Sequence, residues 1–158
     1  MPYFDRVGGI DFSLNMLALA RSSLALPIQG EADRLPIATG SVDFLISFGL
    51  TEHLYEIAGF FSEVRRVLNG EGRATIRFLN RRSVWRHATG RQYPGGLQAY
   101  SARDVGDASL ASGLHLLHVR PFQAAGPLTS YLPPLIDRLE RIPGLNQFFL
   151  ATFKPVGS

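Results

Sequence analysis

The sequence predicts a single α/β domain over residues 1–158 with a mainly parallel sheet. Segments with helical and with strand periodicity alternate along most of the chain, which is typical of βαβ units. A length of 158 residues is enough to bury a core, and 46% hydrophobic residues with 11% aromatics is typical of a globular protein. No apolar run reaches the ~20 residues of a membrane-spanning helix, and the first residues do not resemble a signal peptide, so we expect a cytoplasmic protein.

The chain is expected to begin with a strand, a helix and a second strand. Residues 6–10 form the first strand, which ends before Asp11. Ser13 can cap a helix over residues 14–26, because its hydroxyl accepts a hydrogen bond from a backbone N–H that has no partner within the helix. Residues 26–30 form the short second strand.

A buried strand, an amphipathic helix and an alternating strand come next. Residues 42–48 are mostly apolar, as in a strand buried on both faces, and Asp43 is the polar exception. A helix begins at Ile57, and Gly70 supplies its stop. Its apolar positions have the i, i+3, i+4, i+7 spacing of one helix face: Phe60, Phe61, Val64, Val67 and Leu68. Apolar and polar residues alternate over 73–79, which predicts a strand.

The second half of the chain starts irregularly and then returns to regular elements. Residues 80–98 are polar and interrupted by glycine, which predicts a long loop or a short irregular helix. The elements expected after it are a helix over 101–112 that ends at Gly113, a strand over 114–122, an amphipathic helix over 131–141 and a closing strand over 146–153.

Composition limits the chemistry of the chain. The sequence has no cysteine, which excludes disulfides and thiol nucleophiles, and its four histidines have no acidic cluster near them that would make a metal site. Fifteen of the sixteen basic residues are arginine, and the stretch from Arg73 to Arg103 contains no acid. We interpret this stretch as a solvated linker. A nucleic-acid-binding surface, which fits the pI near 9.7, is the lower-ranked alternative.

Asp11 is the first candidate for ligand binding. It follows a strand and precedes a helix, and ligands of open α/β sheets bind beyond the carboxyl ends of the strands. Its two carboxylate oxygens can accept hydrogen bonds from two neighbouring sugar hydroxyls. An ordinary helix start is the alternative.

Four segments, in this order, resemble motifs of the class I S-adenosylmethionine-dependent methyltransferases. They are VGGIDFSLNMLALAR from Val7, GEADRLPI from Gly30, SVDFLIS from Ser41 and FSEVRRVLNGEG from Phe61. A looser similarity covers residues 100–119 and 148–153. The resemblance implies a Rossmann-like fold, with a mainly parallel sheet, helices on both faces and an antiparallel last strand.

The resemblance also implies S-adenosylmethionine as the methyl donor. The cofactor-binding residues carried over by position are Asp11, Phe12, Glu31, Ala32, Ser47 and Phe48. Glu31 would accept a hydrogen bond from the adenine amino group, and the backbone N–H of Ala32 would donate to a ring nitrogen. Ser47 would lie beside the methionine part of the cofactor.

The implied reaction is in-line methyl transfer to an O, N or C nucleophile of a small molecule. His53 is the candidate general base, because imidazole titrates near neutral pH, and a histidine at a helix entry without a catalytic role is the alternative. Residues 81–100 and 121–134 would shape the acceptor pocket. Apolar residues beside arginines there favour a lipophilic or anionic acceptor, with core packing as the alternative: Trp85, Tyr93, Phe122, Tyr131 and Leu132.

The first strand, glycine-rich loop and first helix of this family have no counterpart. They need roughly 20 residues or more, and only ten residues precede Asp11. The strand normally lies in the middle of the sheet, so we expect two strand edges without neighbours and a truncated chain that binds the cofactor weakly or not at all. Three alternatives stay open: the second strand shifts to pair with the fourth, a second chain or fragment completes the sheet, or the chain is a non-catalytic remnant or partner subunit.

Overall fold

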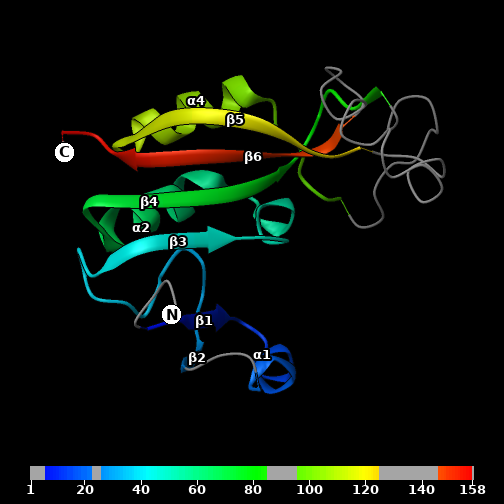
Figure 1. Ribbon diagram of the computed structural model, residues 1–158. Helices are drawn as coiled ribbons and strands as arrows, with labels where there is room; N and C mark the ends of the chain where they lie inside the picture. Colours follow the sequence, from blue (N-terminus) through cyan, green and yellow to red (C-terminus); the bar gives the residue numbers. More distant parts are fainter. Residues whose placement is uncertain (1–5, 23–25, 85–95, 125–145, 158) are drawn as a thin grey trace, which may run out of the picture.

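The structure is a computed structural model that describes residues 6–22, 26–84, 96–124 and 146–157. In chain order these residues form β1 (Gly8–Asp11), α1 (Leu14–Ala20), β2 (Leu26–Gln29), β3 (Val42–Ser47), the 3-10 helix η1 (Thr51–His53), α2 (Ile57–Val67), β4 (Leu68–Leu79), α4 (Ala102–Ala111), β5 (Leu114–Ala124) and β6 (Asn146–Pro155) (Figure 1). In this part of the chain no helix has the length and apolar character needed to cross a membrane.

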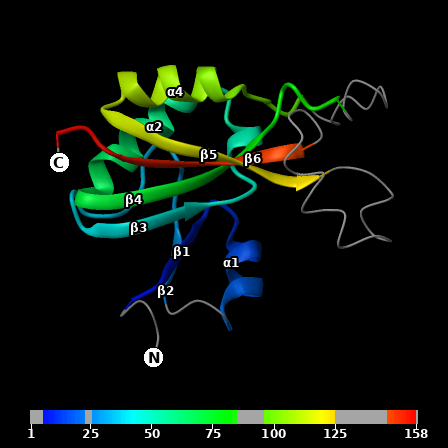
Figure 2. The ribbon, with the colours of Figure 1, turned by 45° about the horizontal axis from the view of Figure 1, so that its top comes forward.

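The larger of two sheets contains four strands in the order β3–β4–β6–β5. β3 is parallel to β4, whereas β6 is antiparallel to both β4 and β5, so β6 alone runs against the others. This is the expected α/β sheet with an antiparallel last strand. α2 and α4 lie on one side of this sheet, whereas α1 lies against β1 and β2 (Figure 2).

The core lies between this sheet and α2 and α4. Phe61, predicted on the apolar face of the helix, is fully buried, and its ring centroid lies 5.3 Å from that of Phe153 and 6.3 Å from that of Phe78. Alternate residues of β4 face the same core: Ala74, Ile76 and Phe78. We call β3 to β6 with α2 and α4 the sheet body.

β1, α1 and β2 form a separate N-terminal unit. β1 and β2 pair in parallel, from Gly8 opposite Leu26 to Asp11 opposite Gln29. β1 is the strand next to β3 in Figure 1, yet the two do not belong to one sheet. The expectation of two strand edges without neighbours is therefore confirmed within the described residues, and the alternative in which the second strand shifts to pair with the fourth is not what the structure contains.

The end of α2 corrects one prediction. The helix ends at Val67, and Leu68 is already extended, with φ −66° and ψ 134°. Gly70 therefore lies inside β4 and is not the helix stop. The side chain of Leu68 is buried in the core and its backbone pairs with Val42, which stabilises an immediate change from helix to strand.

The other elements lie close to their predicted positions. The helix expected over residues 14–26 is shorter and ends at Ala20. α4 begins at the expected cap, where Ser101 and Asp104 form a reciprocal capping box. The helix expected over residues 131–141 lies outside the described residues, as do Trp85, Tyr93, Tyr131 and Leu132.

Candidate functional site

Asp11 is the exposed last residue of β1, at the carboxyl end of the strand. Oδ1 accepts a hydrogen bond from the backbone N–H of Ser13 at 2.7 Å, which fixes the turn into α1. Ser13 then caps α1, since its hydroxyl accepts from the N–H of Met16 at 3.4 Å. The local sequence therefore holds an exposed carboxylate where open α/β sheets bind ligands.

Glu31 and Ala32 follow β2 at the same edge of the N-terminal unit. The N–H of Gly30 donates to the carbonyl of Asp11 at 3.2 Å, so the ends of the two strands are joined. A side chain at Gly30 does not fit, because its Cβ would lie 2.6 Å from Cδ of Pro36. Glu31 is exposed at the start of a tight turn that closes on Arg34, and Ala32 packs against the edge of the core.

The loop after this turn is fastened to α2. The N–H of Leu35 donates to Oε2 of Glu63 at 2.7 Å. Arg66 donates to the carbonyls of Leu35 and Ile37 at 2.9 and 2.8 Å, and it pairs with Glu63 at 2.8 Å. The hydrogen bond from Arg66 lowers the pKa of Glu63, and the Leu35 N–H adds to this effect, while partial burial opposes it. This clamp, Glu63 with Arg66, fastens the loop that follows the N-terminal unit to α2 of the sheet body.

Ser47, Phe48 and His53 lie at the carboxyl end of β3. Ser47 is buried as the last residue of the strand, whereas Phe48 is 52% exposed. The ring of Phe48 lies 6.2 Å from that of Phe122 on β5. His53 is the exposed last residue of η1, whose backbone N–H donates to the carbonyl of Leu50 at 2.9 Å.

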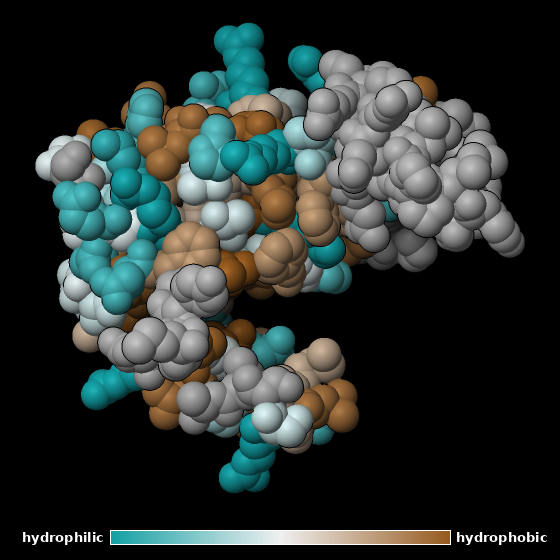
Figure 3. Space-filling model, in the orientation of Figure 1, coloured by the Kyte–Doolittle hydropathy of each residue, from teal (hydrophilic) through white to brown (hydrophobic). Residues whose placement is uncertain are grey.

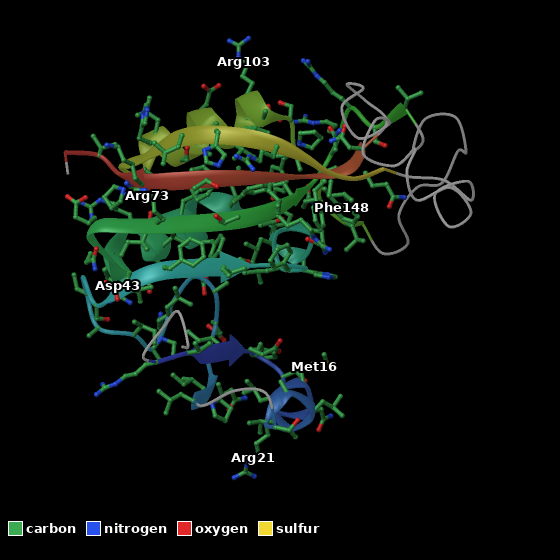
Figure 4. The ribbon with its side chains drawn as sticks, viewed as in Figure 1. Met16, Arg21, Asp43, Arg73, Arg103 and Phe148 are labelled. Carbon is green, nitrogen blue, oxygen red and sulfur yellow. The ribbon has the colours of Figure 1, made fainter. Side chains whose placement is uncertain are left out.

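An ion pair between Glu52 and Arg77 lies behind Phe48. Nη2 of Arg77 donates to Oε1 of Glu52 at 3.0 Å, and the two side chains are only 20% and 9% exposed. The guanidinium lies over the ring of Phe148 at 4.3 Å and near that of Phe48 at 5.9 Å. Figure 4 labels Phe148 near the start of β6, beside the carboxyl ends of β3 and β4. A cation between two aromatic rings thus closes this end of the sheet body.

Tyr100 and Thr51 hold η1 against β4. Oγ1 of Thr51 donates to the carbonyl of Arg77 at 2.9 Å, and the hydroxyl of Tyr100 donates to the carbonyl of Thr51 at 3.4 Å. Burial, and then the nearby Glu52 carboxylate, raise the pKa of Tyr100. The phenol therefore remains a protonated hydrogen-bond donor at neutral pH.

Comparison with known proteins identifies the fold. Residues 1–76 match the family model described as Methyltransferase domain. An S-adenosylmethionine-dependent methyltransferase from Thermotoga maritima is similar in structure, with TM-score 0.73 and 15% identity over 94% of this chain and 72% of that chain. The chain has the fold of the class I S-adenosylmethionine-dependent methyltransferases. The match indicates S-adenosylmethionine as the methyl donor.

Two further structures share the methyltransferase fold. One is an S-adenosylmethionine-dependent methyltransferase from Mesorhizobium loti, with TM-score 0.70 and 20% identity over 94% of this chain and 80% of that chain. The other is a chain of the Haloferax volcanii complex between the Trm112 methyltransferase activator and a methyltransferase, with TM-score 0.71 and 18% identity over 97% of this chain and 72% of that chain. No curated protein sequence matches this chain.

Within this methyltransferase fold the predicted residues form two groups. Asp11, Phe12, Glu31 and Ala32 lie on the N-terminal unit, while Ser47, Phe48 and His53 lie on the sheet body. Figure 3 shows a notch between the two parts, lined in places by hydrophobic side chains. The structure does not bring the two groups into contact.

The residues that sequence reasoning missed are Glu52, Arg77, Glu63 and Arg66. Glu52 and Arg77 lie 25 residues apart, and Glu63 accepts from the N–H of Leu35, 28 residues away, so no local spacing predicts either contact. The Glu63–Arg66 pair has the i, i+3 spacing of a helix surface pair, which the sequence also offers at many other positions. Only the folded structure shows that Glu63 and Arg66 also form hydrogen bonds with residues 35–37.

The arginine-rich stretch does not form one free basic surface in the described residues. Arg77 pairs with Glu52, and Arg81 pairs with Asp104. Arg73 donates to the carbonyls of Glu71 and Gly72 at 2.9 and 3.1 Å. Arg86 and Arg91 lie outside the described residues. In the part that is described, no group of three or more histidine and acidic residues could hold a metal ion.

Proposed function

We propose that this chain carries the nucleoside-binding and acceptor-binding parts of a methyltransferase that acts on a lipophilic or anionic small molecule. The observation that carries the proposal is the position of two kinds of side chain. Exposed acids lie at the carboxyl ends of β1 and β2, and an aromatic cluster with one cation lies at the carboxyl ends of β3, β4 and β5. Open α/β sheets bind their ligands at this edge.

The N-terminal unit would hold the nucleoside. The Asp11 carboxylate would accept hydrogen bonds from the ribose hydroxyls, with Phe12 beside it, because a carboxylate can accept from two neighbouring donors. Glu31 would accept from the adenine amino group, and the backbone of Ala32 would donate to the ring. Ser47 and Phe48 would line the methionine part.

S-adenosylmethionine, when bound, supplies a methyl group on a positively charged sulfur. Asp11, Glu31 and the backbone of Ala32 would hold the nucleoside so that this methyl group faces the acceptor. His53 would accept the proton that the acceptor loses, since it is exposed at the same edge as Phe48. The rest of the site would act by holding the acceptor in line.

The acceptor would lie against Phe48, Phe122 and Phe148. These rings offer apolar surface, and the guanidinium of Arg77 between two of them has donors beyond the one bound to Glu52. A planar fork of donors binds carboxylate or phosphate well. This combination favours an aromatic or aliphatic acceptor with a negative charge.

Completion of the sheet by a second chain or fragment belongs to the same proposal. The two groups of site residues lie on parts whose strands do not pair with each other. Without a strand between them we expect weak cofactor binding. A non-catalytic role as a partner subunit is the alternative, and a cytoplasmic location stays a prediction of the sequence.

Adenosine titration followed by two-dimensional amide NMR tests the nucleoside site. We expect weak, millimolar binding of adenosine that shifts the signals of residues 11–13 and 31–32. The binding is weak because adenosine contacts only this part of the site. Asp11→Asn should weaken this binding at least fivefold. Asp107→Asn is the matched control, since Asp107 is an exposed acid on α4. If Asp11→Asn and Asp107→Asn bind adenosine with the same affinity, the nucleoside site is refuted.

The same titration with 3-phenylpropionate tests the acceptor end. We expect shifts at Phe48 and Arg77 in the wild-type chain and their loss in Arg77→Met. The paired variant Arg77→Met with Glu52→Gln removes the charge that the first change leaves behind, so it keeps the test valid if the single variant unfolds. Arg103→Met is the control, because Arg103 is 88% exposed on α4. Binding that survives in both Arg77 variants would contradict the acceptor site.

A further inference from the structure

The four-stranded sheet has two faces of different composition. On β4 and β6 every second residue faces the core, as Ile76, Phe78 and Phe153 do. The residues between them point to the opposite side, because successive side chains of a strand alternate. α2 and α4 pack on the core face, so this second face lies in front of both helices in Figure 1. Its polar residues come from β4, β5 and β6.

One row of polar side chains crosses the second face near the start of β4. Lys154 on β6 pairs with His115 on β5, and residues opposite each other in neighbouring strands share a face. Arg73 lies one residue before the pair that Ala74 forms with Phe153, which places it beside Lys154. Figure 4 labels Arg73 at this end of the sheet. Two positive charges and an imidazole therefore lie side by side.

A β-bulge in β5 extends this polar surface. The register between β5 and β6 shifts between Leu116 and His118, so Leu117 is an extra residue in β5. An extra residue reverses the alternation of the side chains beyond it. Without Leu117, His118 and Arg120 would point to the core side of the sheet. With it, His118 lies opposite Thr152 on the second face, and Arg120 follows two residues later on the same face.

We call these side chains the cationic face: Arg73, Lys154, His115, Thr152, His118 and Arg120. None of them is acidic, and Oγ1 of Thr152 lies 3.1 Å from Oγ1 of Thr75, so two hydroxyls lie in its middle. Figure 3 shows hydrophilic side chains over the starts of β4 and β5. Arginine and lysine are almost never fully buried without a partner charge. This composition is that of an antiparallel sheet face that meets water or a charged ligand, and not of one packed under a helix.

The cationic face leads to aromatic rings at its other end. Phe148 on β6 pairs with Phe122 on β5. Lys154 lies six residues after Phe148 in the same strand, which corresponds to about 20 Å. The charges and the rings together form a strip along β6 that is three strands wide.

We propose that the cationic face binds single-stranded nucleic acid along β6. Phosphates would contact Arg73, Lys154 and Arg120, and a base would stack on the rings at the end of the strip. A positively charged surface that follows the backbone, combined with aromatic rings for the bases, is how proteins bind single strands. The net charge of +3 and the pI near 9.7 favour a polyanion. Of these cations only Arg73 belongs to the arginine-rich stretch, and the inference goes beyond the proposed function without depending on it.

A single strand fits the strip better than a duplex or a bilayer. Neighbouring strands are about 4.8 Å apart, so three of them offer a width of about 10 Å, enough for one nucleic-acid backbone. A base can stack on a ring only where it is not already paired within a duplex. The apolar side chain in the middle of the strip, Leu150, is half-buried and does not protrude as a membrane-inserting residue would.

Fluorescence anisotropy of a labelled twelve-nucleotide oligouridylate tests the proposal. We expect binding to the wild-type chain with a Kd in the micromolar range at low salt. Three phosphate contacts predict that the logarithm of the association constant falls against the logarithm of the salt concentration with a slope of about −2. Raising the salt from about 50 to 200 mM should therefore weaken binding more than tenfold.

Two substitutions decide where the oligonucleotide binds. Lys154→Gln and Arg120→Gln together should raise the Kd at least tenfold and reduce the salt slope to about −0.7, because one phosphate contact remains. Arg103→Gln is the matched control, since the Arg103 side chain is 88% exposed on α4, at the other face of the sheet. Circular dichroism checks that each variant is folded.

Four outcomes would overturn the proposal. They are no binding, a salt slope near zero in the wild-type chain, equal weakening by Arg103→Gln and by the double variant, and a twelve-base-pair duplex that binds as tightly as the single strand. A fifth would assign the face to a membrane surface instead. In that case vesicles containing phosphatidylserine would bind the wild-type chain more tightly than the oligonucleotide does, and the double variant would lose this binding.

Discussion

The sheet body and the N-terminal unit differ in how they bury their side chains. The core cluster belongs to the sheet body, where Phe61, Phe78 and Phe153 are fully enclosed. Among its described residues, the N-terminal unit contributes Leu17 alone to the buried apolar residues. Yet the acids expected to bind the nucleoside lie on this unit. Stability and ligand binding are therefore assigned to different parts of the chain, and the clamp at Glu63 is one of the connections between them.

The largest expected effect on stability comes from truncating a large buried side chain in the core of the sheet body. Phe61→Ala should lower the free energy of unfolding by about 3–5 kcal/mol, because it leaves a large cavity among packed rings. Leu17→Ala removes a buried side chain from the N-terminal unit and should lower it by less than about 1 kcal/mol, since that unit can open by itself. Urea unfolding followed by circular dichroism measures both values.

The two stability losses show whether the N-terminal unit unfolds separately from the sheet body or together with it. Similar losses in the two variants would mean that the N-terminal unit unfolds together with the sheet body. In that case hydrogen exchange at residues 8–11 would be as slow as in β4. We expect it to be faster by orders of magnitude, because few apolar contacts protect β1.

The sequence predicted the elements of the sheet body because their signals are local. The apolar spacing of Phe60, Phe61 and Val64 and the alternation from Ala74 to Phe78 each require one face to be buried. The stop at Gly70 failed because the burial of Leu68 outweighed the local preference for glycine as a helix end. Tertiary packing, rather than a turn residue, ends α2.

The candidate site was predictable only in part. Asp11 and Ser47 are the last residues of their strands, so their positions at the carboxyl ends could be predicted from chain order. The pairs Glu52–Arg77 and Leu35–Glu63 join residues 25 and 28 positions apart, and no periodic pattern encodes such contacts. Two strand edges without neighbours were expected from the absence of a central strand. The exposure of α1, in which only Leu17 is buried, was not.

A smaller effect should appear in the clamp that links the two parts. The pKa of Glu63 is lower in the folded chain than in the unfolded chain, mainly because of the hydrogen bond from Arg66. Its contribution to stability is therefore fully present above about pH 4.3, the ordinary value for glutamate, and is lost as the pH falls through the folded pKa. Glu63→Gln should flatten the fall in stability below that pH.

The clamp prediction also has a local readout at neutral pH. The amide of Leu35 donates to Glu63, so its hydrogen exchange should become faster in Glu63→Gln, while exchange in β4 should not change. Glu71→Gln serves as the control, because Glu71 is an exposed glutamate of the sheet body. If Leu35 exchanges at the wild-type rate in Glu63→Gln, the loop does not depend on the clamp.

The smallest effect compares the two helix caps. Ser101 caps α4 through a reciprocal box, with its N–H donating to Asp104 at 2.8 Å, and Ser101→Ala should lower the free energy of unfolding by about 1 kcal/mol. Ser13 caps α1 with one hydrogen bond of 3.4 Å. Ser13→Ala should leave the global urea midpoint unchanged and accelerate exchange at Met16 alone. A midpoint shift as large as that of Ser101→Ala would show that α1 belongs to the cooperative core, and the division between the two parts would then be wrong.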